Sequence, residues 1–307
     1  ESSFEDGWEN YYFLQCANLD GKEMSMLCSR EYGWIPLGYL NTTPFRSTFD
    51  GGGYKITGLK INKELTAGVG LFGYAHGAHF RNIHLDKANL NGDFAVGGIL
   101  GAAISSEGKM FTTIFENCKI TNSTINTVAN GFGAGGILGC VDQFTRVNLN
   151  KCSTDSSTTV YATMNAGGMI GVAAIYSNIT AGLCENHSNV TSDYGCAGGI
   201  VGACDTLYAA ICHNAGTING AVKYKEGEEV NGFTGIGAGG IAGGTGMSCF
   251  GACTNKGTIT GYKSAGGILG STRVSGTIEG EDYLCQNSFI ECCTNKGTIK
   301  ANDIAGG

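Results

Sequence analysis

The five residues Gly97-Gly98-Ile99-Leu100-Gly101 recur along the chain and decide its architecture. The block reads GGILG again at 135–139 and 266–270, GGMIG at 167–171, GGIVG at 198–202 and GGIAG at 239–243. A looser copy lies at 70–73 and a shortened one at 306–307. The second glycines of the full copies, at 98, 136, 168, 199, 240 and 267, are 38, 32, 31, 41 and 27 residues apart by subtraction. A unit repeated at this spacing predicts a solenoid, a propeller or another array of stacked units.

The composition supports an ordered repeat protein. The 307 residues include 52 glycines and two prolines, but 42% are hydrophobic and 15% charged, which is too apolar for a flexible glycine-rich linker. The glycines are therefore expected where the backbone turns or packs closely. A net charge of -7 disfavours nucleic acid and anionic membrane surfaces as partners. No apolar run approaches the roughly 20 residues of a membrane span.

The chain divides into two parts. Residues 1–31 lack the repeat and contain several aromatic residues, and we predict that they form an N-terminal cap that covers the first coil. Residues 32–307 are predicted to form one solenoid of repeats. We expect this solenoid to continue or to associate beyond residue 307, because the repeat stops there within a glycine block.

Each repeat holds three short apolar runs separated by glycine or Asn-x-Gly corners. In the last unit these runs lie around 266–270, 289–299 and 304–307, and none is long enough for a typical helix. Short strands joined by corners are typical of a parallel β-helix. We therefore predict an all-β, right-handed parallel β-helix of about 7 to 9 coils with three short strands per coil.

Two columns of residues keep the same place in successive repeats. The first contains cysteines, at Cys118, Cys152, Cys184, Cys212, Cys253 and Cys293; the second, two residues later, contains Asn186, Asn214, Asn255 and Asn295. We expect the cysteines to point inward as small apolar residues, and the stacked asparagines to hydrogen-bond along the axis. Gly216, Gly257 and Gly297 follow the asparagines, and we expect them to supply a positive φ at the corner.

Cysteines outside the column are the better candidates for disulfides. Coils lie about 4.8 Å apart, so repeated bridges along one column would strain the strands. The candidate pairs are Cys16 with Cys28, Cys249 with Cys253, and Cys285 with Cys292. Cys140, Cys196 and Cys204 could be either buried free thiols or members of disulfides.

The repeat resembles that of the GLUG-motif proteins, which are surface and secreted proteins mainly of bacteria. Residues 45–58 resemble the opening coil of that family, and residues 70–73 resemble the motif itself. The Cys-x-Asn-x-Gly-x-Ile sequence pattern resembles the later repeats of the family. The resemblance covers roughly residues 34–307. It implies an extracellular or cell-surface β-solenoid of adhesin-like character. The family repeat also occurs in an immunoglobulin-cleaving metallopeptidase, but this chain has no His-Glu-x-x-His zinc motif.

Few residues in the sequence are candidates for catalysis. Asp142 and Asp205 follow the glycine block at the same offset, about two coils apart, and solvated carboxylates are the simpler interpretation. A cluster of glutamates lies in an insertion, at Glu226, Glu228 and Glu229, and a charge run of this kind keeps a loop in water. The spacing of His76, His79 and His84 does not favour convergence on one metal ion. We expect no catalytic, metal-binding or cofactor-binding site.

Five Asn-x-Ser/Thr sequons are possible glycosylation sites if the source is a eukaryote. They begin at Asn41, Asn122, Asn178, Asn189 and, with a competing place in the asparagine column, Asn186.

The sequence favours a non-enzymatic extracellular or cell-surface β-solenoid with a structural or adhesion role. Its expected partners are other protein chains, through self-association or on a host or cell surface, or glycans. One alternative is a repeating subunit of an extracellular filament joined through the solenoid ends. A less favoured alternative is a polysaccharide-active β-helix enzyme, which would need a groove with paired carboxylates and a basic residue.

Overall fold

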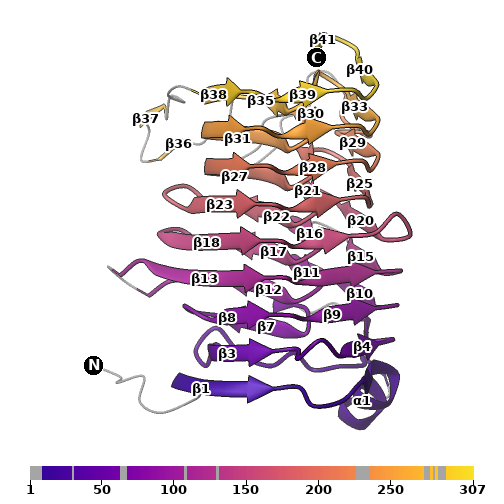
Figure 1. The fold of residues 1–307 in the computed structure, drawn as a ribbon, viewed down its shortest axis with the longest axis vertical. Helices are drawn as coiled ribbons and strands as arrows, with labels where there is room; N and C mark the ends of the chain where they lie inside the picture. Colours follow the sequence, from indigo (N-terminus) through magenta and orange to yellow (C-terminus); the bar gives the residue numbers. More distant parts are fainter. Residues whose placement is uncertain are drawn as a thin grey trace.

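The chain forms a stack of coils whose strands run parallel in four sheets (Figure 1). The computed structural model describes residues 9–29, 31–62, 68–106, 109–128, 131–225, 236–272, 277–278, 281–282 and 288–307. One α-helix, α1 (Gly21–Cys28), lies near the N-terminal end. The prediction of an all-β parallel β-helix is therefore confirmed.

Sheets A and B form one side of the stack. Sheet A contains β1 (Glu9–Leu14), β3 (Arg46–Asp50), β7 (Phe72–Ala75), β8 (His79–Arg81), β12 (Leu100–Ala103), β13 (Phe111–Glu116), β17 (Leu138–Val141), β18 (Thr145–Asn150), β22 (Ile170–Ala173), β23 (Asn178–Gly182), β27 (Val201–Ala210), β31 (Ala242–Gly251), β35 (Leu269–Ser271) and β38 (Ser288–Glu291). Sheet B contains β2 (Leu19–Asp20), β4 (Lys55–Thr57), β9 (His84–Asp86), β14 (Lys119–Thr121), β19 (Ser153–Thr154), β24 (Glu185–Asn186), β28 (His213–Asn214), β32 (Thr254–Asn255) and β39 (Thr294–Asn295).

Sheets C and D complete each coil. Sheet C contains β5 (Lys60–Asn62), β10 (Asn89–Gly92), β15 (Thr124–Thr127), β20 (Thr159–Ala162), β25 (Asn189–Ser192), β29 (Ile218–Gly220), β33 (Ile259–Gly261) and β40 (Ile299–Ala301). Sheet D contains β6 (Gly68–Val69), β11 (Ala95–Gly97), β16 (Gly133–Gly135), β21 (Asn165–Gly167), β26 (Ala197–Gly198), β30 (Gly237–Gly239), β34 (Ser264–Gly266) and β41 (Ile304–Gly306). A separate antiparallel pair joins β36 (Thr277–Ile278) to β37 (Glu281–Asp282).

The prediction of three strands per coil was too low. The coil that begins with β13 continues through β14, β15 and β16 to β17, so it has five strands in four sheets. From β8 onward, the corner between sheets A and B is formed by residues with left-handed backbone that are not glycine, such as Asn117 with φ 52° and Lys151 with φ 54°. These corners are not marked by glycine or proline, so the sequence pattern did not separate the strands on either side.

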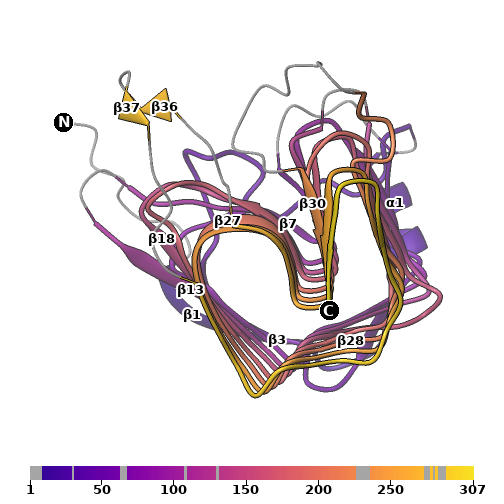
Figure 2. The same cartoon turned by 90° about the horizontal axis from the view of Figure 1, so that it is seen from above.

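The repeated glycine block forms an inward fold of the chain. Seen along the axis, each coil has two lobes, and the chain turns inward between them where sheet D passes into sheet A (Figure 2). A Cβ atom on Gly136 would lie 2.1 Å from the carbonyl oxygen of Gly168 in the next coil, and one on Gly139 would lie 2.5 Å from the Val96 nitrogen. Side chains at these positions would therefore push neighbouring coils apart, as the sequence predicted.

The interior contains three clusters of buried side chains. The largest includes a run of aromatic rings in contact, Phe45, Phe72, Phe80 and Phe115, at the N-terminal end. The second lies between sheets C and D and includes Val160, Val190, Ile218 and Ile259. The third contains only small residues, Ala95, Ala102, Cys140, Val172, Cys196 and Ala203, and it lies between sheet D and the adjoining strands of sheet A. Buried cysteines thus serve as small apolar residues at this close contact.

The N-terminal segment adds strands and a helix to the first coil. Strand β1 pairs in parallel with β3, and β2 pairs with β4. Asp20 caps the helix by accepting hydrogen bonds from the backbone N–H groups of Lys22 and Glu23. Ser25 lies on the helix and its hydroxyl accepts from the Lys60 N–H at 3.1 Å, which ties the helix to sheet C. The division into a cap at 1–31 and a solenoid at 32–307 stays a prediction, and residues 1–8 lie outside the described part.

Candidate functional site

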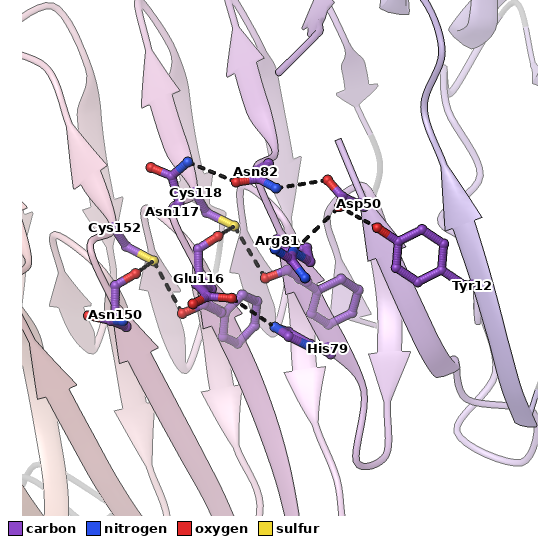
Figure 3. Close-up of polar contacts among 12 residues, drawn as sticks. Tyr12, Asp50, His79, Arg81, Asn82, Glu116, Asn117, Cys118, Asn150 and Cys152 are labelled. Carbon is purple, nitrogen blue, oxygen red and sulfur yellow. Dashed lines mark hydrogen bonds and ion pairs between the residues drawn. The ribbon is translucent and has the colours of Figure 1, made fainter. Parts of the chain in front are cut away.

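The cysteine column lies inside the stack next to the corner between sheets A and B. Cys118, Cys152, Cys184, Cys212 and Cys253 are fully buried. The thiol of Cys118 donates to the carbonyl oxygen of Phe80 one coil away, and Cys152 repeats this bond to Phe115 (Figure 3). Burial raises the pKa of Cys152 well above its ordinary value. A thiol that is buried and protonated packs as a small hydrophobe and does not act as a nucleophile.

The asparagine column forms a continuous buried ladder in the later coils. Asn186 Nδ2 donates to Asn214 Oδ1, Asn214 to Asn255 and Asn255 to Asn295, each at 2.8 Å. Each Asn also bonds to the backbone of its own coil; for example, the Oδ1 of Asn214 accepts from Gly216 N–H and its Nδ2 donates to Gly216 O. The ladder satisfies buried polar groups that would otherwise destabilise the fold.

The glycines after the asparagines have a different role from the one predicted. Gly216, Gly257 and Gly297 do not have positive φ; among the described residues that conformation occurs at glycines such as Gly58 and Gly77. A Cβ at each of the three positions would lie 1.9 Å from a carbonyl oxygen of the preceding coil. Close approach of the neighbouring backbone therefore explains these glycines.

Two of the predicted disulfides are not formed. Cys249 and Cys253 have free thiols, because the Cys249 side chain is on the outer side of β31 next to buried Phe250, whereas Cys253 points inward. Cys16 and Cys28 are also free and exposed; Cys16 precedes helix α1 and Cys28 is its last residue, and the sequence analysis did not predict this helix. Cys292 is free and its candidate partner, Cys285, lies outside the described residues. Cys140, Cys196 and Cys204 are buried free thiols, and burial raises the pKa of Cys196 to about 12.

A polar network joins the N-terminal strand to the next three coils on the outer side of sheet A (Figure 3). The Tyr12 hydroxyl donates to Asp50 Oδ2, Asn82 Nδ2 donates to Asp50 Oδ1 at 2.9 Å, and Asn117 Nδ2 donates to Asn82 Oδ1 at 2.8 Å. Arg81 Nε lies 3.4 Å from the same Asp50 carboxylate. These contacts extend over β1, β3, β8 and the corner after β13. Their arrangement holds the first coils together.

A second set of polar contacts between coils lies where three strands of sheet C end. The carboxylate of Asp193, which is 3% exposed, accepts a hydrogen bond from the Tyr161 hydroxyl and lies 2.8 Å from Lys223 Nζ. Burial, together with the hydrogen bond to Asp193, raises the pKa of Tyr161. The sequence analysis did not single out these residues, because they belong to three different repeats.

The outer face of sheet B gathers positive charge in its first coils. Parallel pairing puts Lys55, His84 and Lys119 side by side on β4, β9 and β14. The residues that follow them, Ile56, Leu85 and Ile120, are buried, so the basic residues face outward. In the described part of the chain neither lysine ammonium lies within ion-pair distance of a carboxylate. We call this set the basic column.

The ring of His84 is held by a relay of hydrogen bonds. The Thr121 hydroxyl donates its only proton to Asp86 Oδ1 at 2.7 Å, and His84 Nε2 lies 2.9 Å from the Thr121 oxygen. Nε2 must therefore carry the proton and donate to Thr121, which leaves Nδ1 as an acceptor. Burial, together with the charges of Lys55 and Lys119, lowers the pKa of His84, so the ring is neutral at pH 7.

A hollow of about 300 Å³ continues from the basic column toward the C-terminal end. One wall consists of residues of the left-handed corner, Lys151, Leu183 and Ile211, and the other consists of Ser153, Glu185 and His213, which begin strands β19, β24 and β28. Ser153 is paired with Lys119, so the hollow and the basic column share one face of sheet B.

The other residues singled out in the sequence lie apart from this face. Asp142 and Asp205 take equivalent positions two residues after the paired strand residues Cys140 and Ala203, two coils apart; Asp142 is exposed, whereas Asp205 is buried and accepts from the Tyr176 N–H. His76 packs on the Phe111 ring, and His79 lies 3.5 Å from Glu116 on the outer side of sheet A. The glutamate cluster at 226–229 is outside the described residues.

The sequons differ in exposure. Asn41 and Asn189 are exposed, Asn178 is half-buried, and the exposed Asn122 donates through Nδ2 to Asp86. Asn186 is fully buried in the asparagine ladder.

Among the described residues, no group of three or more His, Cys, Asp or Glu side chains is arranged to hold a metal ion. In the same residues, no helix is long and apolar enough to span a membrane.

The coils, ladders and inward fold define this chain as a parallel β-helix solenoid. Its fold is similar to that of the crystal structure of a putative immunoglobulin A1 protease from Bacteroides ovatus, with a TM-score of 0.61 and 18% sequence identity. The similarity covers 95% of this chain and 79% of that one. No protein-family model and no curated protein sequence matches the chain. At this identity the comparison supports the fold alone.

Proposed function

We propose that the chain is a non-enzymatic structural and adhesion solenoid that acts outside the cell or at its surface. The main support is the unbroken stack, in which hydrogen bonds run from coil to coil in four parallel sheets and in the buried asparagine ladder. Such a stack gives a stiff module with a long outer surface, because each coil is fixed by its neighbours. The resemblance of the repeat to the GLUG-motif proteins supports the same role and the same location.

The adhesive role can be tested by binding of the purified, fluorescently labelled chain to bacterial and animal cells and to immobilised glycans. We expect saturable binding that unlabelled chain displaces. Binding that is neither saturable nor displaceable would contradict an adhesive role.

The non-enzymatic part of the proposal needs a separate assay. The similar Bacteroides ovatus protein is described as a putative immunoglobulin A1 protease, so immunoglobulin A1 and a panel of polysaccharides are the substrates to try. We expect no fragments and no new sugar ends after long incubation. Sustained turnover that one side-chain replacement abolishes would replace this proposal with an enzymatic one.

A further inference from the structure

We propose that the basic column on sheet B, together with the hollow beside it, binds an acidic polysaccharide. The inference rests on the adhesive role proposed above and names the class of ligand. It starts from the contrast between a chain of net charge -7 and a face on which Lys55 and Lys119 have no ion-pair partner among the described residues. A local positive surface on an acidic protein attracts a ligand that carries negative charge.

The acidic groups near the basic column are already engaged by the protein. Asp86 accepts hydrogen bonds from Thr121 and from Asn122 Nδ2. Asp155 accepts from the Asn122 N–H at 3.0 Å and from the Thr158 hydroxyl at 2.6 Å. These carboxylates bind donors of their own or of neighbouring coils, whereas Lys55 and Lys119 are exposed. Lys87, at the corner after β9, adds a further exposed positive charge.

The spacing of the column favours a polysaccharide over other polyanions. Lys55 and Lys119 are separated by two coils, which is about 10 Å and similar to one disaccharide unit of a linear polysaccharide. Between them, the neutral His84 ring offers Nδ1 as a hydrogen-bond acceptor. A sugar hydroxyl is a donor suited to that position, with an acid group on either side for the lysines.

The hollow supplies a wall for the same ligand that is apolar except for Lys151. Leu183 and Ile211 are 44% and 47% exposed and lie next to Ser153 and His213. Pyranose rings have an apolar C–H face and a polar rim, so they match a hollow with one apolar and one polar wall. Glu185 lies between Ser153 and His213 in the polar wall, so the acid groups of the ligand are expected on the side of Glu185 that faces the basic column.

The test measures binding of defined polymers by isothermal titration calorimetry at low and at physiological salt. The probes are polygalacturonate as the carboxylated arm, chondroitin sulfate as the sulfated arm, and dextran as the neutral arm. Poly-glutamate and single-stranded DNA represent the other classes of polyanion. We expect binding of one or both acidic polysaccharides that survives physiological salt, and weaker or no binding of the remaining probes.

A pair of variants separates the site from net charge. In the double variant Lys55→Gln, Lys119→Gln we expect affinity to fall about tenfold or more, because two charged contacts are lost. The matched control is Lys256→Gln, Lys296→Gln, which removes two exposed lysines from the later coils of the same solenoid and should keep wild-type affinity. Circular dichroism checks that both variants are folded.

A second readout locates the ligand at His84. The imidazole signals of His84 in nuclear magnetic resonance spectra should shift on addition of polysaccharide, whereas those of His79, which lies 3.5 Å from Glu116 on the outer side of sheet A, should not.

Three results would overturn the inference: no binding of either acidic polysaccharide, equal loss in both double variants, or equally tight binding of poly-glutamate or DNA. If the wild-type chain still adheres to cells in the assay above, such a result removes the ligand class and leaves the adhesive role. If it adheres to nothing, both proposals fail.

Discussion

The same column of sheet B is apolar in the first coils and polar in the later ones. Ile56, Leu85 and Ile120 fill it at the N-terminal end, and Asn186, Asn214, Asn255 and Asn295 fill it further on. Thr154 lies between the two sets, and its hydroxyl donates to Asn186 Oδ1 at 2.7 Å. This position in the coil therefore accepts either an apolar or a polar side chain. The side chains of neighbouring coils must, however, be of the same kind, so that no buried polar group lacks a partner.

The outer corner between sheets A and B shows the opposite distribution. Its left-handed position is occupied by Asn82 and Asn117 in the first coils, where they are hydrogen-bonded to one another. In later coils the same position carries Leu183 and Ile211, which gain nothing from left-handed backbone. Asparagine thus occupies the outer corner in the first coils and the inner column in the later coils. Four predictions test what this exchange contributes.

The largest effect is expected from Asn214→Leu in the middle of the ladder. The change removes bonds to Asn186 and Asn255 and leaves the buried Gly216 N–H without its partner. Unfolding free energy should fall by about 4 kcal/mol, because each buried group left unpaired costs roughly 1–3 kcal/mol. Urea unfolding followed by circular dichroism measures it. The half-buried Asn219, whose bond to Thr191 is 3.4 Å, provides the control Asn219→Leu, with a loss below about 1 kcal/mol. Equal losses would mean that the ladder adds no stability of its own.

The reverse exchange, Leu85→Asn, should cost about 3 kcal/mol. Leu85 is fully buried, and its neighbours in the column, Ile56 and Ile120, have no polar group to bond with an amide. The same urea experiment applies, with Leu85→Ile as a volume-conserving control that should lose less than about 1.5 kcal/mol. If asparagine proved as well tolerated as isoleucine, matching between neighbours would not explain the two halves.

A smaller effect, in this case an increase in stability, is expected from Leu183→Asn at the outer corner. Leu183 has φ 54° and is 44% exposed, and asparagine adopts this conformation more readily. Stability should rise by about 1 kcal/mol. Leu40 is similarly exposed but does not have positive φ, so Leu40→Asn should change stability by less than about 0.5 kcal/mol. A loss at Leu183 would show that its side chain contributes packing that outweighs the backbone strain.

The smallest effect is a local loosening of the first coils in acid. Burial acts to raise the pKa of Asp50, but hydrogen bonds from Tyr12, Asn82 and Gly52 N–H, with the charge of Arg81, hold that pKa below its ordinary value of 3.8. A lowered pKa means that the stabilisation is complete above pH 3.8 and is lost as the pH falls through the lower value of the folded state. The asparagine ladder has no ionisable group and should not respond.

Hydrogen exchange can compare the two regions directly. The Gln15 N–H, which donates to Asp50 O at 2.8 Å, should lose protection below pH 3.8, after correction for the intrinsic exchange rate. The Gly216 N–H in the ladder should keep its protection. Asp50→Asn should remove the difference between neutral and acid pH at Gln15. Uniform loss in both regions would indicate global unfolding instead.

Features that recur in several repeats could be predicted from the sequence. The glycine block, the inward cysteines and the stacked asparagines each recur at a fixed place in the unit, and the parallel β-helix follows from them. The number of strands could not be predicted, because corners at residues such as Lys151 and Leu183 use left-handed backbone without glycine. Helix α1 was missed although Asp20 is a good N-cap, because the segment occurs once and has no repeat to compare.

The candidate site was predicted less well than the fold. Lys55, His84 and Lys119 belong to three repeats separated by insertions of different length, so only the strand register puts them side by side. His84 was noted in the sequence, but with His76 and His79, which lie elsewhere. Total charge also pointed away from an anionic ligand, because a sum over the chain does not show where its positive groups gather.

The asparagine ladder gives the stack a direction. Every Asn is held the same way round by backbone groups of its own coil, as Gly257 N–H and O hold Asn255, so each side chain donates toward the C-terminal end. The amide dipoles are aligned and polarise one another. At the C-terminal end of the ladder, Asn295 Nδ2 donates to Gly297 O at 3.4 Å. A strand that extends the ladder beyond Asn295 must place an acceptor oxygen next to the Asn295 amide group. A coil stacked there with its asparagine amide reversed would present a second N–H donor to the Asn295 donor.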